Sequence, residues 1–189
     1  MSSTPLSRSR GGNPGKLVVV GILLLAVGLA GFAWWWNWER TVKCRAFYGG
    51  EGASLIRTAS QVEGLTLSGL YDDESREQLE VGPHALEVVG RRDLSKANGL
   101  IHARTALLDD NSYGWRVPTS PDCQPLILHA VRFREGERRI TLAFDFGCRR
   151  VWIVETQKNV TLAPKIASGW ESFLQRQMNP EGERGASAP

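Results

Sequence analysis

A run of twenty residues without a charged side chain, Leu17 to Trp36, constrains this chain most strongly. A helix rises about 1.5 Å per residue, so such a run spans roughly 30 Å, the thickness of the hydrocarbon core of a bilayer. In lipid, every backbone N–H and C=O must find its partner within the segment, which favours a helix. The sequence therefore predicts a single transmembrane anchor over residues 17–38, with the lipid bilayer as its partner.

Tryptophans gather at the far end of this run. Indole rings are apolar bodies with one polar N–H, and they concentrate where a membrane meets water. We therefore expect a membrane-interface anchor made of Trp34, Trp35, Trp36 and Trp38.

Basic residues flank the run on both sides: Arg8, Arg10 and Lys16 precede it, and Arg40, Lys43 and Arg45 follow it. Basic flanks are retained in the cytoplasm. Counting the terminal amine, the short flank before the run carries slightly more positive charge than the flank after it. A long domain follows the second flank. The pattern predicts a single-pass signal anchor, with the amino terminus in the cytoplasm and the domain outside it. The inverted topology, with a cytoplasmic domain, is an open alternative.

A cleaved signal peptide is a second alternative, because small residues at Gly28 and Ala30, or at Gly31 and Ala33, fit a cleavage site. The apolar run exceeds the usual signal core of about 7–15 residues, however, and it ends in tryptophans. Leu29-Ala30-Gly31 resembles the start of a lipoprotein box, but Phe32 stands where that box needs a cysteine, which excludes lipidation there.

The formal net charge of +3 comes from the residues before the apolar run, and in the rest of the chain the numbers of basic and acidic residues are equal. A balanced domain lacks the extended basic surface that nucleic acids require, so we expect no nucleic-acid partner. The composition predicts a disordered cytoplasmic tail over residues 1–16 and another disordered tail over 179–189. Gly49-Gly50-Glu51-Gly52 predicts a flexible juxtamembrane linker over 39–60. One extracytoplasmic domain should fill 61–178.

The domain pattern predicts an α+β fold. Two short strands are expected at Val62–Leu67 and Leu86–Val89, and a hairpin at Leu126–Phe146. Helical spacing predicts two packed helices, Leu94–Leu108 with Asp93 as its N-cap, and Pro164–Met178. The antiparallel hairpin is the centre of the predicted sheet.

The hairpin register can be deduced from its alternation. If Arg134 pairs with Arg139, then Phe133 faces Ile140, and one face becomes apolar. The same register places His129 opposite Phe144 and Ile127 opposite Phe146 on that face. The other face carries Arg132, Arg134, Arg139, Thr141 and Asp145.

The register also makes Cys123 and Cys148 diagonal neighbours across the strands. In an oxidising compartment they can form a disulfide, and buried free thiols are the alternative. Cys44 is then the odd cysteine near the membrane, where it can link two chains. Ala26 and Ala30 form a small-xxx-small pair that offers a second route to self-association through the span.

No catalytic, cofactor or metal motif occurs in the sequence. His129 lies near the two cysteines in projection, but zinc ligands normally come in closely spaced pairs, so a core histidine is favoured. We therefore expect no metal or cofactor and hypothesise a membrane-tethered interaction or structural module of the cell envelope, not an enzyme. The alternative is a small extracytoplasmic hydrolase or thiol redox enzyme using Cys148, His129 or Asp145.

Residues from Leu94 to Ile153, with Tyr113, Cys123 and the strand pair ending at Cys148, resemble small bacterial exported or membrane-anchored domains of no assigned function. In those domains a Tyr-containing turn, a cysteine and a strand pair ending in cysteine follow a helix. Where they have two cysteines in the second strand, this chain has Ala143, Asp145 and Cys148. The resemblance implies a bacterial envelope location.

Overall fold

The computed structural model describes residues 14–69, 76–117 and 123–178. The chain divides into two compact units, one ending at Glu39 and one beginning at Arg40. The first contains helix α1 (Pro14–Glu39), which includes the long apolar run. The expectations for residues 1–13, for 179–189 and for the charged run at 70–75 lie outside the described residues.

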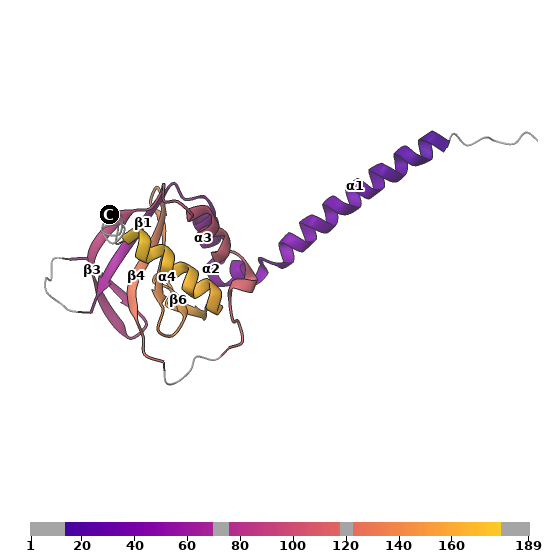
Figure 1. Ribbon diagram of the computed structural model, residues 1–189. Helices are drawn as coiled ribbons and strands as arrows, with labels where there is room; N and C mark the ends of the chain where they lie inside the picture. Colours follow the sequence, from indigo (N-terminus) through magenta and orange to yellow (C-terminus); the bar gives the residue numbers. More distant parts are fainter. Residues whose placement is uncertain (1–13, 70–75, 118–122, 179–189) are drawn as a thin grey trace, which may run out of the picture. The chain divides into compact units, whose positions relative to one another are not determined.

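The second unit has an α+β fold built on one antiparallel sheet with strand order β2-β3-β1-β4-β5-β6-β7 (Figure 1). The strands are β1 (Gln61–Ser68), β2 (Gln78–Val81), β3 (His84–Asp93), β4 (Ile127–Glu135), β5 (Arg138–Asp145), β6 (Arg150–Ile153) and β7 (Lys158–Thr161). The β4–β5 hairpin lies in the middle of the sheet. The predicted fold class and its central hairpin are therefore confirmed, and the predicted strands at Val62–Leu67 and Leu86–Val89 lie within β1 and β3.

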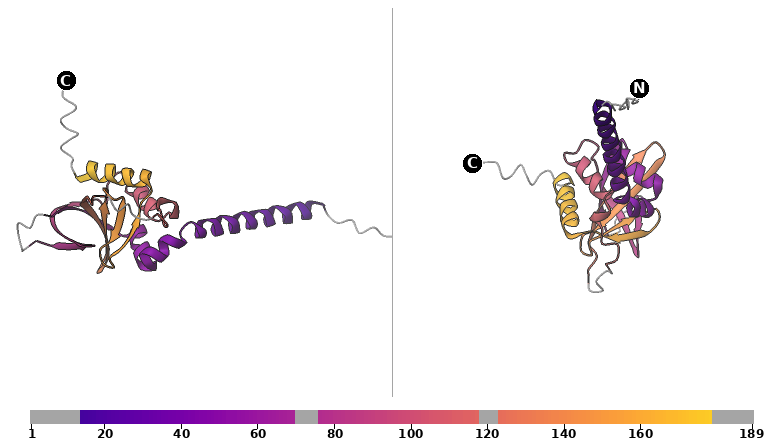
Figure 2. Two further views of the ribbon diagram at one scale, coloured as in Figure 1. Left: turned by 90° about the horizontal axis from the view of Figure 1, so that it is seen from below. Right: turned by 90° about the vertical axis from the view of Figure 1, so that its right-hand side faces the viewer.

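Three helices, and not the two expected, pack against one face of the sheet: α2 (Val42–Thr58), α3 (Leu100–Leu107) and α4 (Pro164–Met178). A 3-10 turn, η1 (Asp110–Ser112), follows α3. In Figures 1 and 2, α4 lies across the sheet with α3 beside it. The main core forms between these helices and the outer side chains of the strands, among them Phe133, Leu142 and Phe144. The bounds of α4 match the prediction.

The predicted linker at 39–60 is wrong, because most of it forms α2 and belongs to the core. Cys44 and Ile56 are fully buried, and Tyr48 is 6% exposed. Gly49 has a φ of 75° and allows a kink inside the helix. A Cβ at Gly52 would lie 2.9 Å from Cδ1 of Ile140 on β5, so this glycine lets α2 approach the sheet closely. The glycines that suggested a flexible linker instead allow a bend within α2 and its close contact with β5.

The predicted helix at Leu94–Leu108 is also too long, since α3 starts only at Leu100. Gly99, at a φ of 89°, precedes it in the left-handed conformation, which a helix interior does not contain. Asp93 does not cap the helix: its carboxylate accepts a hydrogen bond from the Ser95 amide at 2.8 Å and forms a local turn. Leu94 is nevertheless fully buried. The apolar spacing therefore predicted correctly that Leu94 is buried and incorrectly that it lies in a helix.

The predicted hairpin register is confirmed from Arg134↔Arg139 to His129↔Phe144. It fails for the last pair, because a bulge between Ile127 and His129 places Ile127 opposite Asp145 instead of Phe146. A bulge inserts one extra residue in one strand and shifts all later pairs.

The sheet curls so that its second face is enclosed as well. A second apolar cluster, containing Leu65, Leu79 and Ala143, fills the inside of the curl. At the closing edge, Gln157 joins the β6–β7 turn to β2: its Oε1 accepts from the Gly82 amide at 2.8 Å, and its Nε2 donates to the Glu80 carbonyl at 2.7 Å.

The hairpin's polar face therefore does not point wholly to solvent. Arg132 is 6% exposed, Thr141 1% and Asp145 2%. The alternation of side chains along a strand shows which residues share a face of the sheet. It does not show that both faces are buried, which here results from the curl of the sheet.

Candidate functional site

The apolar helix α1 is the first feature with functional meaning. The segment Val18–Trp36 is long and apolar enough to cross a membrane, and none of it is buried inside the protein. The aromatic side chains near its end contact one another, with Phe32 and Trp36 at 6.1 Å and Trp34 and Trp38 at 5.9 Å between ring centroids. A long apolar helix that is not buried suits either a membrane span or a signal sequence.

The second feature is a disulfide between Cys123 and Cys148, with a Cα–Cα distance of 5.2 Å. It closes a loop across a sequence separation of 25 residues, worth about 3 kcal/mol of stability in the chain-entropy account. Such bonds persist in oxidising compartments. Together with α1, the disulfide points to a secreted or membrane-anchored protein.

The disulfide bears on the alternative hypothesis of an enzyme that uses Cys148, His129 or Asp145. Cys148 is bonded and therefore offers no thiolate nucleophile while the bond exists. The buried carboxylate of Asp145 accepts hydrogen bonds from the amides of Leu126 at 2.9 Å and Cys148 at 3.0 Å, so it shapes the turn that carries the cysteine. Arg150 Nη2 lies 3.6 Å from Cys123 Sγ.

His129 remains separate from this arrangement. It is half-buried, burial lowers its pKa, and its Nδ1 lacks a hydrogen-bond partner within the described part of the chain. Among the described residues, no group of three or more His, Cys, Asp and Glu side chains could hold a metal ion.

Cys44 is a free thiol, but its complete burial contradicts the expectation that it links two chains. Burial, with the neighbouring Asp110 carboxylate, raises its pKa strongly. Next to it, the hydroxyls of Tyr48 and Tyr113 lie 2.6 Å apart, and Tyr113 donates to the Leu107 carbonyl at 2.8 Å. This buried polar group ties α2 to the end of α3, and its role is structural.

A cluster of arginines and glutamates lies at one end of the curled sheet. The guanidinium of Arg132 makes two hydrogen bonds to Glu77, from Nη2 to Oε1 at 2.6 Å and from Nη1 to Oε2 at 3.3 Å. Arg91 pairs with the same carboxylate, and Glu63 lies 3.8 Å from Arg132. Burial works to raise the pKa of Glu77, but Arg132 and Arg91 outweigh it and hold the pKa below its usual range.

Two small cavities, of about 190 and 290 Å³, adjoin this cluster and share Arg132 and Arg139 in their walls. The sequence placed Arg132 on the polar hairpin face but gave no sign that it is buried. Its partner Glu77 lies just before β2, far from Arg132 in the sequence, and no local sequence pattern indicates that the two side chains pair. Glu77 and Glu63 pair with the guanidinium of Arg132, so this buried charge is compensated within the sheet.

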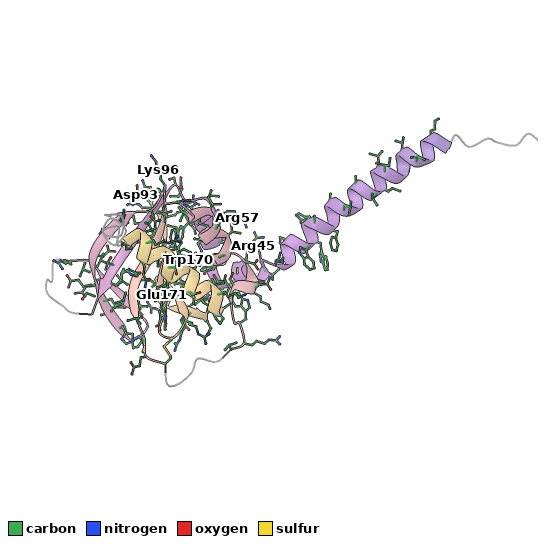
Figure 3. All side chains as sticks on the ribbon, in the orientation of Figure 1. Arg45, Arg57, Asp93, Lys96, Trp170 and Glu171 are labelled. Atoms are coloured by element: carbon green, nitrogen blue, oxygen red, sulfur yellow. A yellow bond between two sulfur atoms is a disulfide. The ribbon has the colours of Figure 1, made fainter. Side chains whose placement is uncertain are left out.

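A groove of about 270 Å³ separates α3 from α4. Its lining includes the small residues Ala103 and Ala106 on α3 and Gly169 on α4, and the aromatic side chains of Trp170 and Phe173 on α4. Trp170 is labelled in Figure 3. The helical spacing of Trp170 and Phe173 in the sequence indicates a buried stripe on the last helix, and both are buried, but this spacing does not indicate a groove. The small residues facing them could have indicated it only once the helices were known to be neighbours.

The chain matches none of the known protein families, and searches among curated proteins and among solved structures each find no match.

Proposed function

We propose that this protein is a membrane-tethered binding module of the cell envelope, with its amino terminus in the cytoplasm and its α+β domain outside. The observation that carries the proposal is the combination of an unburied apolar helix with a disulfide in the domain that follows. The helix supplies attachment to lipid, and the disulfide suits an oxidising compartment. The resemblance to bacterial exported domains agrees with this location.

The orientation follows from the charges at the two ends of the helix. Lys16 and the arginines before it precede the apolar run, and the tryptophans lie on the side of the domain. Retention of the anchor, instead of cleavage as a signal peptide, is supported by the length of the run, since Val18–Trp36 exceeds a signal core of about 7–15 residues.

A binding role is favoured over catalysis by what the site residues do. Cys148 is bonded to Cys123, and Asp145 supports the turn between them. Neither is available as a reactive group in this arrangement. Helices α3 and α4 leave an open groove between them, which suits recognition.

The orientation can be tested with two fusions after Pro189. One reporter is an enzyme that becomes active only outside the cytoplasm, and the other is a protein that fluoresces only inside it. We expect enzyme activity and no fluorescence. A control fusion that begins at Arg40 and lacks α1 should reverse both readings. Fluorescence from the full chain would contradict the proposal.

A further inference from the structure

The α3–α4 groove has a preformed aromatic floor. Trp170 is 2% exposed and stacks on Phe144 at 4.6 Å, and Phe173 meets Trp170 edge-on at 5.5 Å. Side chains held on two sides by aromatic contacts cannot swing into the groove to fill it. The groove is therefore a stable feature of the fold and costs little reorganisation when a ligand enters.

Trp170 also carries a polar group without a hydrogen-bond partner. The indole Nε1 of Trp170 is buried and lacks an acceptor among the described residues. A buried donor without a partner costs about 1–3 kcal/mol.

The polar side chains around the groove are neutral or basic. Lys165 and Arg176 lie on α4 and His102 on α3, and none of the described residues that line the groove is acidic. Eleven residues separate Lys165 from Arg176, so their Cα atoms lie roughly 16 Å apart along the helix. A peptide of about five extended residues covers that distance.

The arginine cluster inside the curled sheet makes a weaker candidate. There Arg132 and Arg91 already pair with Glu77, and Glu63 lies within 4 Å of Arg132. An anion would have to compete with these carboxylates. Among the described residues that line the groove, in contrast, no acidic side chain accompanies Lys165 and Arg176.

We propose that the α3–α4 groove binds a short acidic peptide segment of a partner protein, which inserts an apolar side chain against Trp170 and Phe173 and places carboxylates beside Lys165 and Arg176. The inference deepens the proposed binding function and rests on it. A volume of about 270 Å³ is below the usual range for cofactor sites, roughly 300–1,000 Å³, and suits one or two inserted side chains.

Gly169 provides a way to block the groove without disturbing the fold. A Cβ at this position meets no atom within 4 Å, and replacement of a helical glycine by leucine improves helix propensity. Gly169→Leu should therefore fill the groove and leave the melting temperature at or above that of the wild type. Gln175→Leu introduces the same side chain at an exposed position of α4 that does not line the groove and lies on another side of the helix, which makes it the matched control.

The experiment uses the full chain in lipid nanodiscs to select from two displayed libraries of nine-residue peptides. Both contain random apolar positions, but one has fixed glutamates where the other has fixed lysines. We expect enrichment only from the glutamate library. Selected peptides should bind Gly169→Leu at least about tenfold more weakly, the effect of losing burial of one apolar side chain. They should bind Gln175→Leu like the wild type.

A Lys165→Glu/Arg176→Glu double variant should also lose binding to the glutamate peptides. The inference is overturned if neither library is enriched, if the lysine library is enriched, or if the selected peptides bind Gly169→Leu as well as the wild type. Any of these results leaves the reporter measurement of topology untouched, so failure of the groove and failure of the membrane orientation remain distinguishable.

Discussion

Gly147 stands where two backbone segments come too close for any other residue. A Cβ there would lie 1.9 Å from the carbonyl oxygen of Gln124, which is part of the chain that leads from Cys123 into β4. Backbone cannot move aside as a flexible side chain can. The glycine thus allows the approach that the disulfide one residue later fixes.

Gly147→Ala should lower the free energy of unfolding by about 1–3 kcal/mol, because the added methyl group overpacks this crossing. Gly50→Ala is the matched control, since a Cβ at Gly50 in α2 meets nothing within 4 Å. It should leave stability unchanged or raise it slightly. Denaturant unfolding of both variants checks the prediction, and equal effects would contradict it.

His129 should make stability depend on pH. Burial lowers its pKa in the folded protein, relative to an ordinary value of about 6.5. As the pH falls through about 6.5, the unfolded chain binds a proton that the folded chain does not, so stability is lost until the lower folded pKa is reached. Melting temperatures between pH 7 and pH 5 should therefore fall less steeply for His129→Gln. An identical pH dependence in the two proteins would exclude this role.

At the scale of the elements, α2 shows how a helix can depend on a distant part of the chain. Its first amides receive no cap from Thr41, which makes no side-chain cap hydrogen bond. Instead Asp110 accepts from the amides of Lys43 at 3.0 Å and Cys44 at 2.8 Å, across more than sixty residues. These are donors that a helix terminus leaves without partners.

Asp110→Ala should therefore destabilise the domain by about 0.5–2 kcal/mol, the usual effect of losing a cap. Asp110→Asn retains an acceptor oxygen and should lose less. Thermal unfolding of the two variants provides the comparison. If Asp110→Ala unfolds like the wild type, the cap does not stabilise α2 as we infer.

The elements that local pattern predicted well are those in which local and tertiary demands agree. The apolar spacing of Ile166, Trp170 and Phe173 after Pro164 defines α4, and alternation defines the β4–β5 register. The pattern failed where a tertiary contact decides the outcome. Gly52 in α2 is explained only by the close approach of Ile140 on β5. Helix α3 begins later than predicted because Gly99 has the left-handed conformation.

The candidate site was predictable in part for the same reason. The predicted register made Cys123 and Cys148 diagonal neighbours, and the disulfide is present although the bulge at Ile127 shifts the pairs beyond it. The burial of Arg132 and the groove beside Trp170 depend on the curl of the sheet and on the distance between two helices. Neither quantity has a local signature in the sequence.

The whole molecule combines two proposed features: the apolar helix is retained as an anchor, and the domain matures in an oxidising compartment. In this proposal the anchor attaches the domain to a membrane, and the disulfide ties Cys123, which precedes β4, to Cys148 between β5 and β6. The location of Cys44 agrees with a thiol that is protected by burial whichever compartment the domain occupies.

The most direct test is the intact mass of the chain extracted from carbonate-washed membranes and alkylated in denaturant without reductant. We predict the uncleaved chain, close to 20.9 kDa apart from the initiator methionine, carrying one alkyl group on Cys44. A product shortened near Ala30 or Ala33 would show that the helix is a cleaved signal. Three alkyl groups would show that Cys123 and Cys148 are unbonded, and either result would contradict the account.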